Sequence, residues 1–200
     1  IELLPEKAAR DYLEFMRELS IACRKEGFFL SVDCYVPYKY NEYYNIKELG
    51  TVCDYVVIMC YDEHYAGSEE AGSVSSLSYV RRGIEESEAV MDKDRIIIAL
   101  PFYTRVWITD KSGKLRSEAM SIKAAQDWIS KNQVSLTFDQ EIGQNYGSIE
   151  VDGEKKEIWM EDEKSMEMKK KLLTEKGIQG IAAWKLGQEP EGFWGILQTK

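Results

Sequence analysis

Hydrophobic residues along the chain gather into four short runs that contain no charged side chain. The clearest run covers residues 55–59, with the sequence Tyr-Val-Val-Ile-Met, and a second covers 96–101, with Ile-Ile-Ile-Ala-Leu-Pro. Residues 28–32 and 178–184 form two further runs. Continuous apolar runs of this length are typical of strands that are buried on both faces, as in a parallel sheet covered by helices. We therefore predict four such strands.

Between these runs, apolar residues recur at the three- and four-residue spacing of amphipathic helices. The spacing predicts a helix over 5–25, where Pro5 suits the first turn and Gly27 follows the end. Helices that alternate with buried strands predict an α/β fold with a parallel sheet. The other predicted helices on this sheet cover residues 46–52, 80–91, 162–176 and 193–198.

The pattern of polar and apolar residues changes between the third and fourth predicted strands. Polar turns there separate short strand-like pieces, and Asp152-Gly153 between two such pieces is a hairpin signal. A helix is predicted over 121–131, with Ser121 as its N-cap. We interpret residues 108–157 as a small α+β insertion, which divides the rest of the fold into 1–107 and 158–200.

Composition excludes some classes of function. The net charge of -9 argues against nucleic acid as the main partner, and no apolar run approaches the length of a membrane span. The four cysteines show neither a CxxC motif nor zinc-like spacing. They are interpreted as buried thiols, with a Cys34–Cys60 disulfide as the alternative. The run of lysines at 169–171 is interpreted as a solvated helix face.

Candidate catalytic or binding residues lie where the predicted strand at 55–59 ends. Tyr61 and Asp62 arrive there together, ahead of a polar loop that runs to Ser76. Ligands of α/β proteins bind at the carboxyl ends of parallel strands. The alternative is an ordinary strand followed by an Asp that caps a turn.

Three strand ends carry distinctive sequences: Met-Cys-Tyr-Asp at 59–62, Leu-Pro-Phe-Tyr-Thr-Arg-Val-Trp at 100–107 and Gly-Ile-Ala-Ala-Trp-Lys-Leu-Gly at 180–187. In this order they resemble strands 6, 7 and 8 of glycoside hydrolase family 18, with Thr104 where that family usually has Gly. Residues 158–165 are most similar to members from spore-forming bacteria. The resemblance implies an α/β fold that is the C-terminal half (strands 4/5 to 8) of a TIM (β/α)8 barrel, with a chitinase-type insertion.

The resemblance also implies a reaction. Members of this family include chitinases and related N-acetylglucosaminidases, which retain configuration by letting the substrate's own N-acetyl oxygen attack the anomeric carbon. Glu2 matches the final Glu of the family's DxxDxDxE motif, the general acid, whereas the aspartates of that motif and strands 1 to 3 are not in this chain. Tyr61 would donate its hydroxyl to the acetamide oxygen. No cofactor and no metal are implied.

The same resemblance assigns binding roles to five further residues. Asp62 would hydrogen-bond sugar hydroxyls, and Met59 would line the pocket wall. Trp184 would form the floor under the sugar ring, because the CH face of a pyranose stacks on aromatic rings. Tyr103 and Arg105 would contact the substrate or its neighbours.

Several alternatives stay open at this point. The chain is either part of a hydrolase acting on N-acetylglucosamine polysaccharide, chitin or peptidoglycan, or a non-catalytic, lectin-like module of the same family. As half of a barrel it has two open strand edges, so it is either a piece of a longer protein or half of a homodimer. The tyrosines at 35–44 either bind sugar or pack the loop. The implied location is extracellular, in the cell wall or on the spore.

Overall fold

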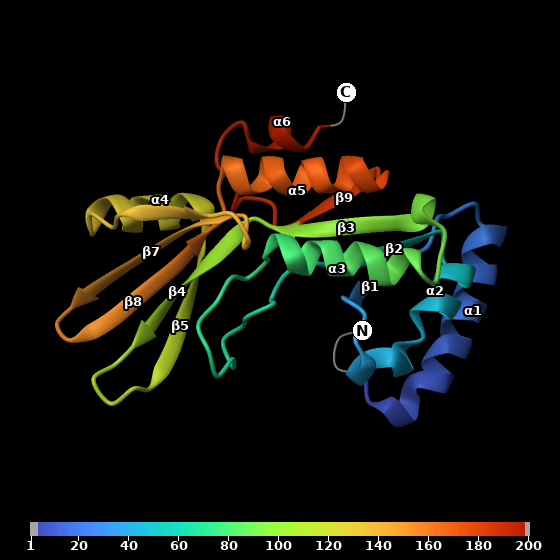
Figure 1. The fold of residues 1–200 in the computed structure, drawn as a ribbon. Coiled ribbons are helices and arrows are strands. Elements are labelled where there is room, and N and C mark those ends of the chain that lie inside the picture. Colours follow the sequence, from blue (N-terminus) through green and yellow to red (C-terminus); the bar gives the residue numbers. More distant parts are fainter. Residues whose placement is uncertain (1–3, 199–200) are drawn as a thin grey trace.

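The computed structural model describes residues 4–198 and holds two sheets (Figure 1). The first is a parallel sheet of four strands in the order β1-β2-β3-β9. Its strands are β1 (Ser31–Tyr35), β2 (Tyr55–Met59), β3 (Ile96–Pro101) and β9 (Gly180–Trp184). The predicted α/β class with a parallel sheet is therefore confirmed, and so is the order of strands along the chain.

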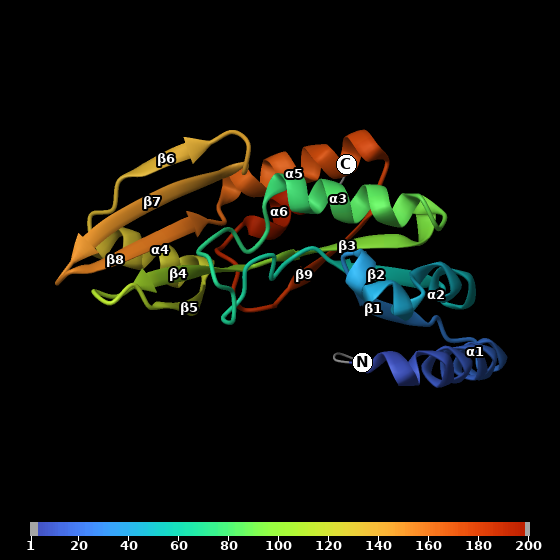
Figure 2. The same cartoon turned by 60° about the horizontal axis from the view of Figure 1, so that its bottom comes forward.

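Five helices accompany the parallel sheet, and Figures 1 and 2 show two of them, α3 and α5, together on one side of it. Asp162 caps α5 at its start, and Gly177 ends it in the left-handed region at φ 74°. The helices are α1 (Ala9–Lys25), α2 (Ile46–Val52), α3 (Leu77–Glu88), α5 (Glu163–Lys176) and α6 (Phe193–Leu197), with 3-10 turns at Glu6–Ala8, Lys39–Tyr44 and Lys93–Arg95.

The second sheet is antiparallel and lies beyond the carboxyl ends of the parallel strands (Figure 1). It has the order β5-β4-β8-β7-β6, and the predicted hairpin turn is present, with Asp152 and Gly153 both at positive φ. The limits predicted for the insertion, residues 108–157, stay a prediction. The antiparallel sheet extends past both limits, since β4 begins before residue 108 and β8 ends after residue 157. Its elements are β4 (Tyr103–Thr109), β5 (Leu115–Ser121), α4 (Ile122–Lys131), β6 (Leu136–Asp139), β7 (Gln144–Val151) and β8 (Glu154–Met160).

The two faces of the parallel sheet differ in burial. Val56 and Ile58 of β2 are fully buried and belong to the same core as Ile84 of α3 and Leu173 of α5. The alternate positions Val57 and Met59 are only partly covered, so the expectation that β2 is buried on both faces is wrong. The reason is that helices pack on one face alone, whereas the other face stays open along β1, β2 and β9.

The first strand begins three residues later than predicted. Gly27 adopts φ 76° after α1, and the amide of Phe28 donates to the carbonyl of Cys23, so the chain is still closing the helix end there. Phe28 and Phe29 are consequently exposed. The strand then buries Val32 and Cys34, which face the helices.

The lysine run at 169–171 is not a uniform solvated face. Lys169 is 1% exposed and forms an ion pair with Glu161, which is fully buried at the end of the antiparallel sheet. Gln144 donates to the same carboxylate, and so does the hydroxyl of Ser165, at 2.7 Å. Burial of Glu161 raises the pKa of its carboxyl, and the Lys169 ammonium opposes that shift. This buried polar cluster joins α5 to β7.

The four cysteines are free thiols, which excludes the Cys34–Cys60 disulfide in this structure. Burial raises the pKa of Cys34 to about 12 and that of Cys53 to about 11. Cys60 is also buried, and its pKa is raised for the same reason. These thiols therefore stay protonated at neutral pH and behave as small apolar side chains.

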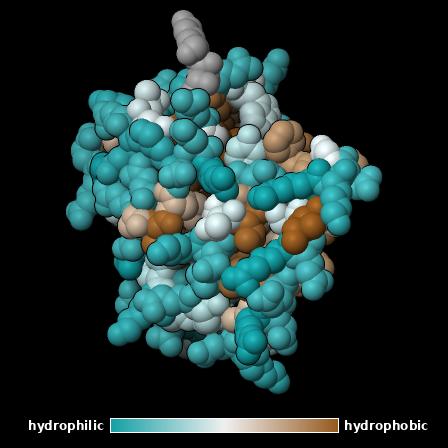
Figure 3. Space-filling view, turned by 90° about the vertical axis from the view of Figure 1, so that its right-hand side faces the viewer, coloured by the Kyte–Doolittle hydropathy of each residue, from teal (hydrophilic) through white to brown (hydrophobic). Residues whose placement is uncertain are grey.

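Between residues 4 and 198, no helix is both long and apolar enough to cross a bilayer. The end of the molecule that carries the amino ends of the strands is mostly hydrophilic, with small separate hydrophobic patches (Figure 3). The residues that the sequence marks for chemistry on β2, β4 and β9 lie at the opposite, carboxyl ends of the strands.

Candidate active site

The register of the parallel sheet brings the predicted residues to one edge of its open face. Met59 pairs with Ala99, which pairs with Ala182, so these three residues form a row across the sheet. Trp184 pairs with Pro101 and lies two residues further along β9 than Ala182, toward the carboxyl ends. Tyr61 follows Met59 by two positions, and both side chains alternate with the buried Ile58 and Cys60.

A short chain of polar side chains fixes Asp62 at this edge. The hydroxyl of Tyr103 donates to Asp62 Oδ1 at 2.6 Å, and Arg105 Nη2 lies 3.8 Å from the same oxygen. Both partners come from β4, which continues from the end of β3. Asp62 itself adopts φ 55°, a left-handed conformation that Asp tolerates better than most residues.

The surroundings of Tyr103 keep its hydroxyl protonated. Burial, and then the hydrogen bond to Asp62, raise the pKa of the Tyr103 phenol above its usual value. Its ring meets that of Tyr61 edge-on, with centroids 6.3 Å apart. Tyr103 therefore acts as a hydrogen-bond donor that orients Asp62, and its ring also packs against Tyr61.

The indole of Trp184 is available to a ligand, because the residue is 54% exposed at the last position of β9. Its backbone is held by the amide of Phe102, which donates to the Trp184 carbonyl at 2.7 Å. The next peptide bond, to Lys185, is cis. In the following loop, Glu189 accepts hydrogen bonds from the Gly187 amide and from the indole of Trp194.

The loop that follows Asp62 is tied down at several points. Both carboxylate oxygens of Glu63 accept hydrogen bonds from Ser76, one from its amide at 2.7 Å and one from its hydroxyl at 3.0 Å. His64 bonds the Ser73 carbonyl through Nδ1 at 2.8 Å, a local loop contact. The indole of Trp107 donates to the carbonyl of Gly72 in the same loop. The antiparallel sheet and this loop therefore hold the end of β2 in place.

Two of the features at this edge were not predicted. Ser117 accepts a hydrogen bond from Arg105 at 3.2 Å, and Arg105 Nε is buried without a partner, so it can still donate to another group. Asp33 precedes the predicted tyrosines and points to the open face, since it alternates with the buried Val32 and Cys34. The alternation of polar and apolar residues over 31–35 is the sequence signal that could have identified Asp33. A cross-strand partner such as Ser117 leaves no signal in the sequence.

Glu2 lies outside the described residues, so the structure does not place the predicted acid. Among residues 4–198, no group of three or more His, Cys, Asp and Glu side chains is arranged to hold a metal ion. The described edge combines hydroxyl and guanidinium donors, a carboxylate and an exposed aromatic surface. Such a set suits a polyhydroxylated, largely uncharged ligand.

Comparison with known proteins identifies the family. The model of "Glycosyl hydrolases family 18" matches residues 2–189. A relative in Bacillus subtilis, the putative sporulation-specific glycosylase YdhD, is 30% identical over 187 residues, which is 90% of this chain and 44% of that protein. The chain thus spans about half the length of the curated relatives it matches.

Solved structures agree with this result. The spore cortex-lytic enzyme SleL of Bacillus cereus superposes with a TM-score of 0.85 and 26% identity, covering 98% of this chain and 46% of that one. A chitinase from Chromobacterium violaceum superposes with a TM-score of 0.87 over 96% of this chain and 61% of that one; at 21% identity it supports the fold alone. The chain therefore belongs to glycosyl hydrolases family 18, and its parallel sheet is part of that family's TIM barrel.

Proposed function

We propose that this chain is the C-terminal half of a glycoside hydrolase that cleaves β-1,4 bonds next to N-acetylglucosamine in chitin or peptidoglycan. The observation that carries the proposal is the arrangement of Tyr61, of Asp62 held by Tyr103, and of the exposed Trp184 along one edge of the open face. A donor, an oriented carboxylate and an aromatic floor are what recognition of an N-acetylated sugar requires.

In the proposed mechanism the substrate supplies its own nucleophile. The acetamide oxygen of the bound sugar attacks the anomeric carbon as the glycosidic bond breaks, and the leaving oxygen takes a proton from an acid, which leaves an oxazolinium ring. Water then attacks the same carbon, reopens that ring and returns a proton to the acid, so the configuration is retained. Positive charge develops on the ring as it forms, and a preorganised donor at the acetamide oxygen acts by keeping that oxygen aligned for attack. We assign this donor to Tyr61 and the acid to Glu2.

The remaining residues position the sugar in this proposal. The indole of Trp184 stacks under the apolar face of the ring, and Met59 of β2 borders the sugar. Asp62 accepts from sugar hydroxyls with the oxygen that Tyr103 leaves free, since Tyr103 occupies only Oδ1. Arg105 directs its unpartnered Nε to the substrate or to a neighbouring group.

The relatives favour a role at the bacterial cell wall. Their names include a sporulation-specific glycosylase and cortical fragment-lytic enzymes of Bacillus species. We therefore propose peptidoglycan of the spore or cell wall as the polysaccharide partner, and a location at that material. Chitin is the alternative substrate with the same N-acetylglucosamine chemistry.

For the 200-residue chain by itself, we propose that a second copy closes the open face. β1 and β9 each have one neighbour, so both are open edges. A two-fold axis parallel to the strands places β1 of each copy beside β9 of the other. Two equivalent pairs of parallel strands then form between the copies. Eight strands make a barrel whose interior is filled by side chains. Tyr35, Met59 and Trp184 would then turn inward.

Light scattering tests this assembly. The expected result is twice the mass of one chain, because burying two edges and the open face removes a surface that promotes association. A monomeric mass at micromolar concentration would contradict the homodimer. The control is a chain extended upstream through strand 1 of the family's barrel (the extended protein), which is expected to be monomeric.

Cleavage of an N-acetylglucosamine hexamer tests the proposed activity. The extended protein is expected to cleave the hexamer, whereas the 200-residue chain binds it without cleaving it. We expect the latter because the aspartates of the family motif are not in the chain. Binding without cleavage by both proteins would instead support a lectin-like module.

A further inference from the structure

The segment just before α3 holds the chain on both sides of residues 61–62, the dipeptide that carries the proposed donor and carboxylate. Ser75 is fully buried, and its hydroxyl donates to the carbonyl of Cys60 at 2.7 Å. On the far side of the dipeptide, the amide of Glu63 donates to the carbonyl of Val74 at 3.0 Å. Val74 and Ser75 are neighbours in the chain, and together they anchor the two ends of the dipeptide.

The hydroxyl of Ser75 is itself held in place. The amide of the same residue donates to the hydroxyl oxygen of Ser73 at 2.9 Å, which fixes the backbone that carries the Ser75 side chain. Ser73, Ser75 and Cys60 are all buried, so the bond to the Cys60 carbonyl is shielded from water. A buried carbonyl that loses its donor costs free energy, so the chain keeps the arrangement that supplies one. The bond from Ser75 therefore constrains the peptide group that joins Cys60 to Tyr61.

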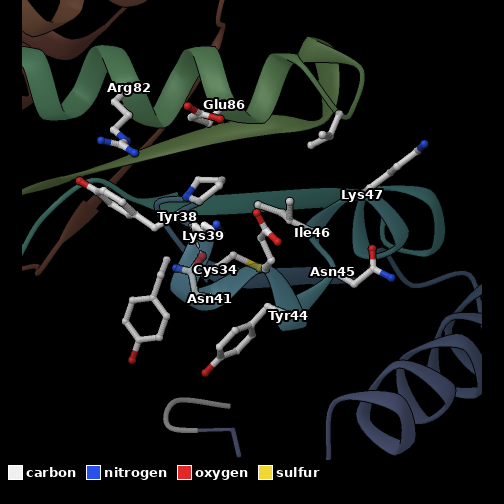
Figure 4. A pocket seen from close by; sticks show the side chains of 14 residues that line it. Cys34, Tyr38, Lys39, Asn41, Tyr44, Asn45, Ile46, Lys47, Arg82 and Glu86 are labelled. Carbon is white, nitrogen blue, oxygen red and sulfur yellow. Dashed lines mark hydrogen bonds between the residues drawn. The ribbon is translucent and has the colours of Figure 1, made fainter. Parts of the chain in front are cut away.

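The helix that begins shortly after Ser75 is packed firmly on the sheet. Gly83 of α3 approaches β2 so closely that a Cβ at this position would lie 2.5 Å from Cys60 Sγ. Figure 4 shows the side chain of Arg82 reaching from α3 to Tyr38 in the loop after β1, and its guanidinium lies 3.8 Å from the centre of that ring. These contacts hold α3 against the sheet, so Ser75 acts from a fixed support.

The backbone at Tyr61 depends on such support because it lies beyond the end of the parallel ladder. The residue pairs between β2 and β3 end at Met59, and Asp62 then adopts φ 55°, so the chain leaves the strand direction at once. The direction of a side chain is set by the backbone that carries it. Bonds from outside the sheet, such as the one from Ser75, must therefore fix the direction of Tyr61.

We propose that Ser75 is a positioning residue for the proposed reaction: its hydroxyl holds the peptide group between Cys60 and Tyr61 so that the Tyr61 hydroxyl meets the acetamide oxygen. The inference rests on the proposed function, which assigns that donor to Tyr61. Ser75 acts through Tyr61 and does not touch the sugar, because it is fully buried. A misplacement of about 1 Å in a group that aligns the reacting atoms can cost about 100-fold in rate, so a small shift of this peptide group is enough to matter.

A double-mutant cycle in the extended protein tests the proposal on the N-acetylglucosamine hexamer. Ser75→Ala is expected to lower kcat about tenfold and to change KM little, because the contacts that bind the sugar remain while the Tyr61 hydroxyl is no longer held in line. In a Tyr61→Phe background the same change is expected to lower kcat less than about twofold, since the hydroxyl that Ser75 positions is already absent.

The matched control is Ser87→Ala. Ser87 is a fully buried serine of α3, and its hydroxyl has no hydrogen-bond partner within residues 4–198. This change is expected to leave kcat unaltered in both backgrounds. An equal fractional loss of kcat from Ser75→Ala in the two backgrounds would overturn the proposal, because Ser75 would then act on the fold and not through Tyr61. An unchanged kcat in Ser75→Ala would overturn it as well.

Amide hydrogen exchange in the 200-residue chain tests the same role without any activity. Ser75→Ala is expected to speed exchange at residues 60–63 about tenfold more than in β3, whose amides report opening of the whole sheet. Equal changes in the two segments would overturn the positioning role, whatever the activity. Faster exchange at 60–63, together with an extended protein that neither binds nor cleaves the hexamer, would support the hold of Ser75 on this backbone and contradict the reaction assigned to Tyr61.

Discussion

Replacing Tyr61 with Phe in the extended protein is expected to lower kcat about 100-fold, because the acetamide oxygen is no longer held in line for attack on the anomeric carbon. KM is expected to change little, because the ring of Tyr61 remains and keeps its edge-on contact with Tyr103. The hydroxyl fixes the orientation of the attacking oxygen, so its loss makes the reactive arrangement rarer while most contacts that bind the substrate remain. Steady-state rates on N-acetylglucosamine oligomers measure both constants.

The matched control is Tyr65→Phe, which removes a hydroxyl from an exposed tyrosine in the same loop. This variant is expected to keep the parent kcat. A Tyr61→Phe protein with unchanged kcat would show that the hydroxyl does not serve the reaction. A rise in KM alone would assign Tyr61 to ordinary substrate binding and not to the transition state.

Replacing Lys169 with Met is expected to lower the free energy of unfolding by about 3–5 kcal/mol, since it leaves the Glu161 carboxylate buried without its counter-charge. The two hydrogen bonds from Gln144 and Ser165 remain but cannot replace a full positive charge. Urea unfolding, followed by circular dichroism, measures the change in midpoint and slope.

Two further variants define the cause of that loss. Lys171→Met, on the same helix but 78% exposed, removes a lysine whose ion pair with Glu175 is long and solvated, and it is expected to have almost no effect. Glu161→Leu combined with Lys169→Met is expected to recover much of the stability, because an apolar pair avoids the desolvation of a lone charge. Equal losses in Lys169→Met and Lys171→Met would contradict the buried-pair account.

The sequence was sufficient for the type and order of most elements. The apolar runs at 55–59 and 96–101 are strands within the predicted limits, and Asp152-Gly153 makes the predicted turn. Ser121 accepts the hydrogen bond from the Ala124 amide that its role as N-cap requires. These signals are local, so they depend little on the rest of the fold.

Features that depend on distant neighbours were predicted less well. The start of β1 was misplaced because Phe28 and Phe29 are apolar and yet lie between the end of α1 and the strand, where both stay exposed. Lys169 was taken for a solvated residue because its partner, Glu161, precedes the helix and turns into the core only in the folded chain. Periodicity identifies a helix but does not reveal a buried ion pair on it.

For the candidate site, motif order was the informative signal. Tyr103 lies 41 residues after Asp62 in the sequence, and Arg105 follows Tyr103 closely. The structure brings both within hydrogen-bonding or ion-pair distance of Asp62. The sequence did not reveal that Asp62 would be oriented from β4. Both Tyr103 and Arg105 reach the same Asp62 oxygen from that strand, and this depends on the fold. The position of Glu2 relative to them stays a prediction.

The measurement that tests the central claim most directly is cleavage of N-acetylglucosamine hexamer by the extended protein and by its Glu2→Gln variant. Our account predicts that the extended protein releases shorter oligomers with retained configuration, and that Glu2→Gln binds the hexamer but cleaves it at least about 100-fold more slowly, as expected for loss of a general acid. Equal cleavage by the two proteins would contradict the assignment of Glu2. Absence of both binding and cleavage in the folded extended protein would contradict the proposed function.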